Sequence, residues 1–460
     1  MALTPFVFIG VGGSGGKTLG VIRQTLKNQL GRIGWDGGIP RGWQFIHVDV
    51  PADSDARSED LLDAVPRTDY AALTDRQSTY ANYAVSLNQR VADATPDSAL
   101  RYQAWDCWQP FPPQVVGASV NISSGAGQFR GIGRVCSLQS LEKVDQKIQG
   151  ALRAVAEAEV AQQLNNIQLL SGDVPINPVA GQPVAFVVGS VSGGSGSGLF
   201  LDVCAILRAK GLKQVISLIF TPEVFTGSDG TMEPGVAPNT FMALNEVTNA
   251  TWSVPQGSVQ PARALLYQAA GVAYPLGPAA PTTVLLVGRG NGNVRFAKPD
   301  DVYKTVGRSL AELALNEAMT QEIVNYDIAN GAAIAAGGHD RLNLSSTRPG
   351  AVKDRAPFRA LGFSRLSVGR DFFEPYVIDR LTRAAILRLL DGHLLRQRPG
   401  ESLPDQELLD RAVDSAWSDF LDATGLDEYG DSNDVTERLS TLEQLEIIDD
   451  LKVNLRPRLR

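Results

Sequence analysis

Two glycine-rich segments hold the residues of this chain that are best suited to bind an anion. The first covers residues 10–18 (GVGGSGGKT) and the second covers residues 192–198 (SGGSGSG). Because glycine has no Cβ, backbone N–H groups in such segments can approach an anion closely, and positive φ angles cost little. A helix that follows the segment directs the positive end of its dipole to the same place. Each segment therefore predicts phosphate binding.

The spacing within the first segment separates three classes of glycine loop. The P-loop pattern G-x-x-x-x-G-K-[ST] fails, because its first glycine would fall on Val11. The dinucleotide pattern G-x-G-x-x-G fits Gly10, Gly12 and Gly15, and Asp49 ends the next apolar run, where such folds keep a ribose-binding acid. A purely structural turn is the third interpretation. The second glycine segment favours a nucleotide held from both sides of its phosphate chain, since a dinucleotide site needs only one such loop.

A third segment, residues 124–131 (SGAGQFRG), could reach a terminal phosphate through its N–H groups and through Arg130. Taken alone, this segment would be interpreted as a plain turn. Lys17 lies in the first turn of the helix that follows the first segment. Its ammonium group could add positive charge beside the phosphates, or it could extend into solvent.

The elements that must position these segments can be predicted from apolar patterning. Apolar residues recur at helical spacing in Leu19, Ile22, Leu26 and Leu30. A stretch rich in Pro, Gly, Gln and Ala over residues 254–281 is expected to be a loop. Five apolar runs bounded by Gly, Pro or Asp predict buried strands, at residues 6–9, 45–48, 184–188, 215–220 and 284–287. Strands that alternate with helices predict an α/β fold with a Rossmann-like parallel sheet, whose ligand loops leave the carboxyl ends of the strands.

The same patterning predicts three regions along the chain. A nucleotide-binding domain is expected over residues 1–298, and residues 299–335 are expected to form a long central helix and a following loop. A smaller α+β domain with a helical C-terminal part is expected over residues 336–460, opening with a strand at 358–368. No sequence feature near Arg460 marks the end of a folded domain, so a natural chain that continues beyond Arg460 is an alternative interpretation.

Composition argues against several classes of protein. The formal net charge is -8, from 50 acidic and 42 basic residues, so nucleic acid is not an expected partner. No apolar run is long enough to span a membrane, and the N-terminus lacks the basic region of a signal peptide. The few, widely spaced cysteines fit a reducing compartment, and we expect the protein in the cytoplasm. No metal site formed by side chains is predicted, because the three histidines are far apart: His47, His339 and His393.

Together and in this order, the glycine segments resemble the loops of the tubulin/FtsZ superfamily, whose members hydrolyse nucleotide and form filaments. SGGSGSG is similar to the signature G-G-G-T-G-[ST]-G, with Ser192 at its first glycine and Ser195 at its threonine. SGAGQFRG is similar to S-G-A-G-N-N-W-A-x-G. GVGGSGGKT matches the bacterial first loop G-V-G-G-x-G-x-N, with Lys17 in place of the usual Asn. FIHVDV resembles F-I-A-I-N-T and places Asp49 on the Asn of that pattern.

The resemblance implies that this chain binds GTP or GDP together with Mg²⁺. Glu233 and Asn239 resemble the E-P-Y-N motif that holds the ribose and the guanine, although the Asn comes three residues late. Tyr303, at the start of the long helix, takes the place of the aromatic residue that stacks on the base. The implied contacts with the phosphates and ribose come from Gly12, Gly13, Ser14, Gly15, Gly16, Lys17, Asp49, Gly125, Ala126, Gly127, Arg130, Ser192, Gly193, Gly194, Ser195, Gly196 and Ser197.

The far end of the long helix resembles the catalytic loop of the family. In N-Y-D-I-A-N, Asn325 begins a match to N-L-D-F-A-D, with Asp327 on the first acid and Asn330 on the second. In the family this loop enters the nucleotide site of the next subunit, where its carboxylates polarise the attacking water. An Asn can orient water but cannot accept its proton. A polar helix end closed at Asn330 and Gly331 is the alternative interpretation.

The resemblance therefore implies a divergent bacterial tubulin-like GTPase, which assembles head to tail and completes each catalytic site with the neighbouring subunit. Two other function classes remain open. A tubulin-like scaffold that binds nucleotide without appreciable hydrolysis is favoured by Asn330 in place of an acid. An NAD-dependent oxidoreductase is compatible with Gly10, Gly12, Gly15 and Asp49, but it leaves the second glycine segment unexplained and lacks a recognisable catalytic motif.

Overall fold

The computed structural model describes residues 3–54, 65–106, 121–172, 181–227, 230–252, 257–290, 295–323, 358–361, 370–396 and 402–412. The chain divides into two compact units, Met1–Phe363 and Ser364–Arg460. The first unit contains all of the glycine segments.

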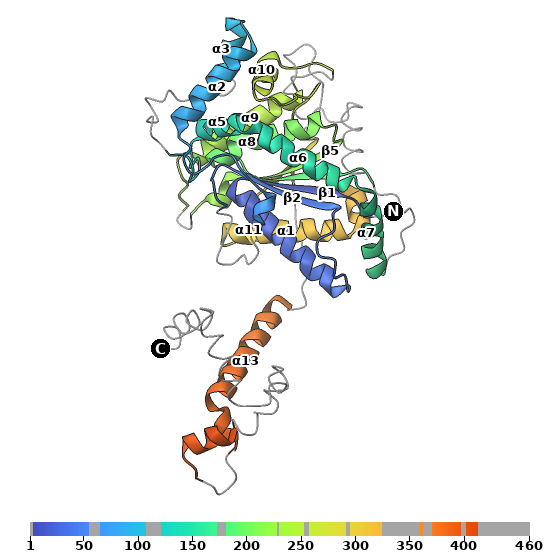
Figure 1. The fold of residues 1–460 in the computed structure, drawn as a ribbon, viewed down its shortest axis with the longest axis vertical. Coiled ribbons are helices and arrows are strands. Elements are labelled where there is room, and N and C mark those ends of the chain that lie inside the picture. The colour runs from blue at the N-terminus through green and yellow to red at the C-terminus, as the bar shows by residue number, and fades with distance from the viewer. Residues whose placement is uncertain are drawn as a thin grey trace, which may run out of the picture. The chain divides into compact units, whose positions relative to one another are not determined.

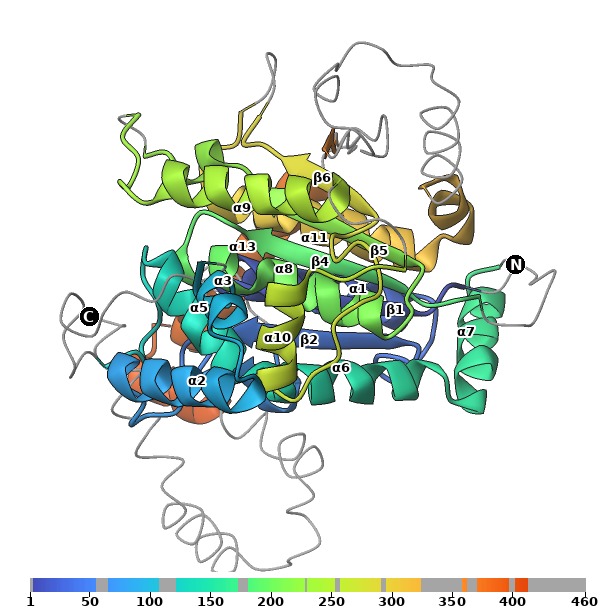
Figure 2. The same cartoon turned by 90° about the horizontal axis from the view of Figure 1, so that it is seen from above.

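In the described part of the first unit, seven parallel strands form one sheet in the order β3-β2-β1-β4-β5-β6-β7. Figure 2 shows the central strands side by side. Each of the five predicted apolar runs lies in one of these strands. The strands are β1 (Phe6–Val11), β2 (Trp43–Asp49), β3 (Tyr70–Ala72), β4 (Val184–Ser190), β5 (Gln214–Phe220), β6 (Thr283–Val287) and β7 (Arg359–Ala360).

Helices cover both faces of this sheet (Figure 1). Side chains of β1 alternate between the two faces: Phe6 and Phe8 belong to one buried apolar cluster, and Val7 and Ile9 belong to the other. The Phe6 side packs against α1 (Gly12–Arg32), α7 (Ala158–Leu170) and α11 (Pro299–Leu315). The Val7 side packs against α2 (Tyr80–Ala94), α3 (Ser98–Asp106), α5 (Arg130–Gln139), α6 (Leu141–Val155), α8 (Gly194–Ala209), α9 (Val236–Trp252) and α10 (Pro261–Ala269). The sheet is therefore buried on both faces, as parallel sheets are.

The helix expected after the first glycine segment is α1, and its predicted apolar face is buried. Leu19, Ile22, Leu26 and Leu30 are all in the core. Helix α11 lies against α1 because Gly307 has no side chain, and a Cβ at that position would lie 2.7 Å from Cβ of Val21. Short 3-10 turns lie at Arg67–Asp69, before β3, and at Pro222–Phe225, after β5.

Two segments differ from the sequence-based expectation. Helix α10 lies inside the stretch 254–281 that was expected to be a loop, and it begins at Pro261, a residue suited to the first turn of a helix. Helix α11 ends at Leu315 rather than continuing as one long helix. Asn316 has an extended backbone, and its Oδ1 accepts from Met319 N at 3.1 Å, so it caps a new helical stretch described as far as Ile323.

The boundary between the units also differs from the expected one at residue 336. Arg359–Ala360 is the edge strand β7 of the first unit, with Leu285↔Arg359 in register on β6. The described part of the strand expected at 358–368 therefore extends the sheet of the first unit instead of opening the second unit. The units divide between Phe363 and Ser364 because the main chain is tied to β6 as far as Leu361, whose N–H donates to Leu286 O at 3.1 Å.

In the second unit the structure describes α13 (Arg370–Asp391), a short 3-10 turn at Gly392–Arg396 and a helical stretch over residues 405–412. Both helices lie within residues 336–460, where a helical C-terminal part was expected. Ile378 and Leu381 of α13 are exposed. Across the described ranges of both units, no helix combines the length and apolar character required to cross a bilayer.

Candidate functional site

The first and second glycine segments meet at the carboxyl ends of two adjacent strands. β1 and β4 pair in register, Val11↔Gly189, and each strand leads directly into a glycine segment. Gly12 adopts φ +70°, and a Cβ at that position would lie 3.5 Å from the backbone nitrogen of Gly196. Ser14 Oγ accepts a hydrogen bond from Ser190 N at 3.0 Å. The N-termini of α1 and α8 therefore lie side by side, and their partly exposed residues are called the glycine surface below.

Two glycines of the predicted site serve helix–strand packing. A Cβ on Gly15 would collide with the carbonyl oxygen of Val188, and a Cβ on Gly196 would collide with that of Ser190. Both helices can begin so close to β4 only because these positions lack side chains. In the first and second segments, the residues that retain partial solvent exposure are Gly13, Ser14, Lys17, Gly193 and Ser195.

The third segment is joined to the second by backbone and side-chain hydrogen bonds. Gly194 N–H donates to Gly127 O at 2.7 Å, and Gly127 has φ +53°. Asn239 Nδ2 donates to Gln128 O and to Ser192 O, both at 2.9 Å. The amide hydrogens of Asn239 thus hold the second and third segments together, and its expected contact with ribose and guanine stays a prediction.

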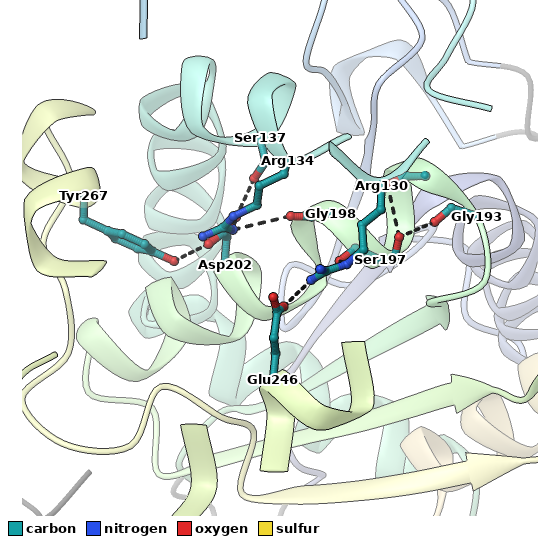
Figure 3. A network of polar contacts seen from close by, with 10 residues as sticks. Arg130, Arg134, Ser137, Gly193, Ser197, Gly198, Asp202, Glu246 and Tyr267 are labelled. Atoms are coloured by element: carbon teal, nitrogen blue, oxygen red, sulfur yellow. Dashed lines mark hydrogen bonds and ion pairs between the residues drawn. The ribbon is translucent and has the colours of Figure 1, made fainter. Parts of the chain in front are cut away.

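Arg130 is also turned toward the protein rather than toward a terminal phosphate (Figure 3). Its Nε donates to Ser197 O at 3.3 Å, and its Nη2 forms an ion pair with the carboxylate of Glu246 on α9. The side chain thereby connects α5, α8 and α9. The guanidinium therefore has an acidic partner within the chain, and the expected phosphate contact of Arg130 stays a prediction.

A buried polar network surrounds Asp202 on α8, the helix that begins in the second segment (Figure 3). The sequence patterns did not predict this network. Asp202 of α8 accepts from Ser137 Oγ and from Tyr267 Oη, each at 2.7 Å, and forms an ion pair with Arg134. Burial lowers the pKa of Arg134, but the adjacent Asp202 carboxylate outweighs it and raises the pKa above its ordinary value. Burial raises the pKa of Tyr267 well above its ordinary value. The one available sequence signal was an acid inside the apolar helix segment GLFLDVCAILRA.

Lys17 contacts the first turn of α11. Its Nζ lies 3.9 Å from Oδ1 of Asp300, and both side chains are partly exposed. Asp301 accepts from Lys298 N at 3.1 Å, which caps the same helix. The ammonium group of Lys17 is thus balanced by a carboxylate at the edge of the glycine surface.

Tyr303 lies in the apolar core between α11 and the sheet. It is 4% exposed, and its ring meets the ring of Phe220 edge-on at a centroid distance of 5.1 Å. Burial raises the pKa of Tyr303 above its ordinary value. This burial contradicts the expected stacking on a base, because the residue is almost entirely removed from solvent. Glu233 is exposed ahead of α9, where its carbonyl accepts from Val236 N at 3.0 Å.

His47, which the sequence patterns did not indicate as a site residue, lies between the first segment and Asp49. Asp49 is 3% exposed, and its Oδ1 accepts from Val50 N at 2.7 Å. His47 is fully buried, with Nε2 3.2 Å from Gly12 O and 3.8 Å from Oδ2 of Asp49. Burial lowers the pKa of His47 to about 4, although the hydrogen bond to Gly12 opposes that shift. A neutral imidazole therefore supports the backbone of the glycine surface.

A comparison with protein families decides the affiliation of the chain. A family model described as "Tubulin like" matches residues 7–387. The chain belongs to this tubulin-like family. This match confirms the expected tubulin-like relationship, and the seven-stranded sheet confirms the expected α/β fold with a parallel sheet. No curated protein is detectably similar in sequence.

Several solved structures are similar to this tubulin-like chain in fold. CetZ2 from Haloferax volcanii, in a GTPγS-bound protofilament, has 16% identity and a TM-score of 0.36 over 70% of this chain and 62% of its own. CetZ from Methanosaeta thermophila has 11% identity and a TM-score of 0.34 over 73% and 60%. An FtsZ dimer from M. jannaschii has 14% identity and a TM-score of 0.30 over 69% and 54%. The matched region thus spans less than two thirds of each of these chains.

The proposed catalytic loop of the tubulin-like chain lies outside the described residues, so Asn325, Asp327 and Asn330 remain assigned from sequence alone. Among the residues that the structure does describe, no group of three or more His, Cys, Asp or Glu side chains is arranged to hold a metal ion.

Proposed function

We propose that this tubulin-like protein binds GTP or GDP on the surface formed by its glycine segments. We further propose that it hydrolyses GTP at a site completed by a neighbouring copy and assembles head to tail. The observation that carries the proposal is the convergence of Gly12 and Gly196 at the ends of adjacent strands. A single phosphate chain can contact both segments only if they share one surface.

The chemistry of this surface fits a phosphate chain. The first N–H groups of an α-helix have no partner within the helix, and the N-termini of α1 and α8 lie side by side here. Both helix dipoles therefore favour negative charge at the same position. Gly13 and Gly193 are partly exposed and present backbone without a side chain. Recognition through backbone donors would hold the phosphates without an arginine, since Arg130 is engaged with Glu246.

Mg²⁺ fits this site as a phosphate-bound ion. It commonly binds through one or two carboxylates, substrate phosphates and several waters, rather than through an all-protein cage. When bound, the ion would neutralise charge that develops on the phosphates.

Completion of the site by a second copy is supported by apolar side chains beside the glycine surface. Phe129 lies within the third segment, immediately before α5, and is 60% exposed. Phe241 is 70% exposed on α9, close in sequence to Asn239, which binds both loops. The hydrogen bond from Asn239 to Gln128 O brings these two segments together, and adjoining exposed apolar side chains are typical of interfaces. In the proposal, Asp327 of the added copy polarises the attacking water, and Asn330 orients it.

Phosphate release measured as a function of protein concentration tests the proposal. Because catalysis in trans requires contact between copies, the rate should rise faster than linearly with concentration. Asp327→Ala should retain GDP affinity and lose turnover. A rate proportional to concentration, or an Asp327→Ala variant with unchanged turnover, would contradict catalysis by the neighbouring copy.

Asn330 supports a second candidate function, a nucleotide-binding scaffold without appreciable hydrolysis. GTP binding and assembly without phosphate release would favour this scaffold function.

A thermal-shift measurement with GTP, ATP and NAD tests which class of nucleotide stabilises the chain. Stabilisation by NAD and not by GTP would overturn both candidates in favour of a dinucleotide site.

A further inference from the structure

A buried histidine on β2 contacts the backbone of the first glycine segment. His47 lies on β2 opposite Gly10 of β1, in the register Gly10↔His47. Its ring is fully buried, and Nε2 lies 3.2 Å from the carbonyl oxygen of Gly12. On its other side, Nδ1 lies 3.4 Å from Ser54 Oγ, and the ring of Tyr70 packs against it at a centroid distance of 4.9 Å.

These contacts define the tautomer of the imidazole. A carbonyl oxygen can only accept, so the hydrogen bond to Gly12 requires the ring proton on Nε2. Nδ1 is then an acceptor, and the hydroxyl of Ser54 donates to it. Burial lowers the pKa of His47 to about 4, so the ring is neutral near pH 7. The neutral imidazole can therefore donate a hydrogen bond to Gly12 O without placing a positive charge beside the first glycine segment.

The hydrogen bond from His47 to Gly12 O also fixes the direction in which the N–H of Gly13 points. A trans peptide unit is planar, and its C=O and N–H groups point in opposite directions. With the Gly12 carbonyl held against His47, the N–H of Gly13 points away from β2. Gly13 is partly exposed and lies in the first turn of α1, where N–H groups have no helical partner.

We propose that His47 is a positioning residue for nucleotide binding: it fixes the Gly12 carbonyl and thereby orients the Gly13 N–H toward a phosphate oxygen. The proposal rests on the proposed nucleotide function and identifies the residue that orients one of its backbone donors. Glycine itself cannot supply this orientation, because Gly12 at φ +70° has a wide range of accessible backbone conformations.

Calorimetric titration with GDP tests this assignment in the full chain. His47→Leu removes the donor and keeps an apolar side chain in the core. His47→Gln keeps an N–H donor at a similar reach. Tyr70→Phe is the matched control, since it removes a neighbouring buried hydrogen bond, from Tyr70 Oη to Pro51 O at 2.5 Å, without altering the contact to Gly12.

The expected result separates positioning from general destabilisation. His47→Leu should weaken GDP affinity about tenfold, His47→Gln should restore most of it, and Tyr70→Phe should bind as the wild type does. Equal affinity of His47→Leu and wild type, or an equal loss in His47→Leu and His47→Gln, would overturn the role of His47 and leave the proposed function intact. A wild-type chain that binds no guanine nucleotide would instead overturn the proposed function.

Nuclear magnetic resonance of chains carrying ¹⁵N-labelled histidine gives a readout that needs no variant. At neutral pH the His47 ring should appear as the neutral Nε2–H tautomer. A neutral ring with its proton on Nδ1 would leave Nε2 unable to donate to Gly12 O and would overturn the inference.

Discussion

A Cβ placed on Gly12 would lie 3.5 Å from the backbone nitrogen of Gly196, although these glycines follow different strands of the sheet. The two residues adjoin because β1 and β4 are neighbours and each strand ends in a glycine segment. The N-termini of two helices are thereby brought to one place. This relationship is the structural basis for proposing one nucleotide site rather than two separate turns.

Substitution of Gly196 should disturb both packing and binding. Because a Cβ at this position collides with the Ser190 carbonyl, Gly196→Ala must displace the start of α8. We expect a loss of stability of about 1–3 kcal/mol by urea denaturation, and a loss of GDP affinity of at least about tenfold by calorimetry.

Gly150 provides the matched control for that substitution. It lies within α6, and a Cβ there would meet nothing within 4 Å. Gly150→Ala should therefore stabilise the chain by up to about 1 kcal/mol and leave GDP affinity unchanged. Normal GDP binding by Gly196→Ala would argue that the start of α8 does not contact the nucleotide.

Tyr303 should behave as a core residue. Tyr303→Leu and Phe220→Leu remove opposite members of the same aromatic pair, so each should lower stability by about 1–3 kcal/mol in urea denaturation. Both variants should retain GDP affinity, because the Tyr303 ring is buried away from solvent. A loss of affinity confined to Tyr303→Leu would restore the base-stacking role expected from the sequence.

The buried network around Asp202 should be highly sensitive to loss of its centre. Asp202→Ala leaves the buried guanidinium of Arg134 without its carboxylate, and we expect a loss of about 3–5 kcal/mol. Tyr267→Phe removes one hydrogen bond to the same carboxylate and should cost about 1.5–3 kcal/mol. Urea denaturation of both variants and the double variant measures the coupling. Strictly additive losses would show that the residues do not act as one network.

His47 should make stability depend on pH below neutrality. Its pKa is about 4 in the folded chain and 6.5 ordinarily, so below pH 6.5 the unfolded chain binds a proton that the folded chain excludes. Stability should therefore fall as the pH drops from about 6.5 to about 4, by at most about 3 kcal/mol from this group. The groups facing the ring are the Asp49 carboxylate, the Tyr70 ring and the Ser54 hydroxyl.

Urea denaturation at a series of pH values, on the wild type and on His47→Gln, measures this contribution. The variant should lose stability less steeply between pH 6.5 and pH 4, because Gln does not titrate. Identical slopes would show that another group controls the acid sensitivity.

Local patterns predicted much of the fold. Apolar runs bounded by Gly, Pro and Asp located the central strands, because a strand buried on both faces must be apolar at successive positions. The spacing of Leu19, Ile22, Leu26 and Leu30 located the buried face of α1 for the same reason. Local patterns were weaker where signals conflicted. Helix α10 was missed in a Pro- and Gly-rich stretch, and the break at Asn316 interrupts an otherwise continuous helical pattern.

By itself, the sequence determined which backbone segments could approach an anion, because glycine content is a local property. Only the tertiary structure decided the partners of the long side chains: Arg130 pairs with Glu246, Asn239 ties two loops together, and Tyr303 packs on Phe220. A flexible side chain can reach many groups, and its choice depends on residues that only folding brings near. The support of Gly12 by His47 belongs to the same class, since it joins two neighbouring strands.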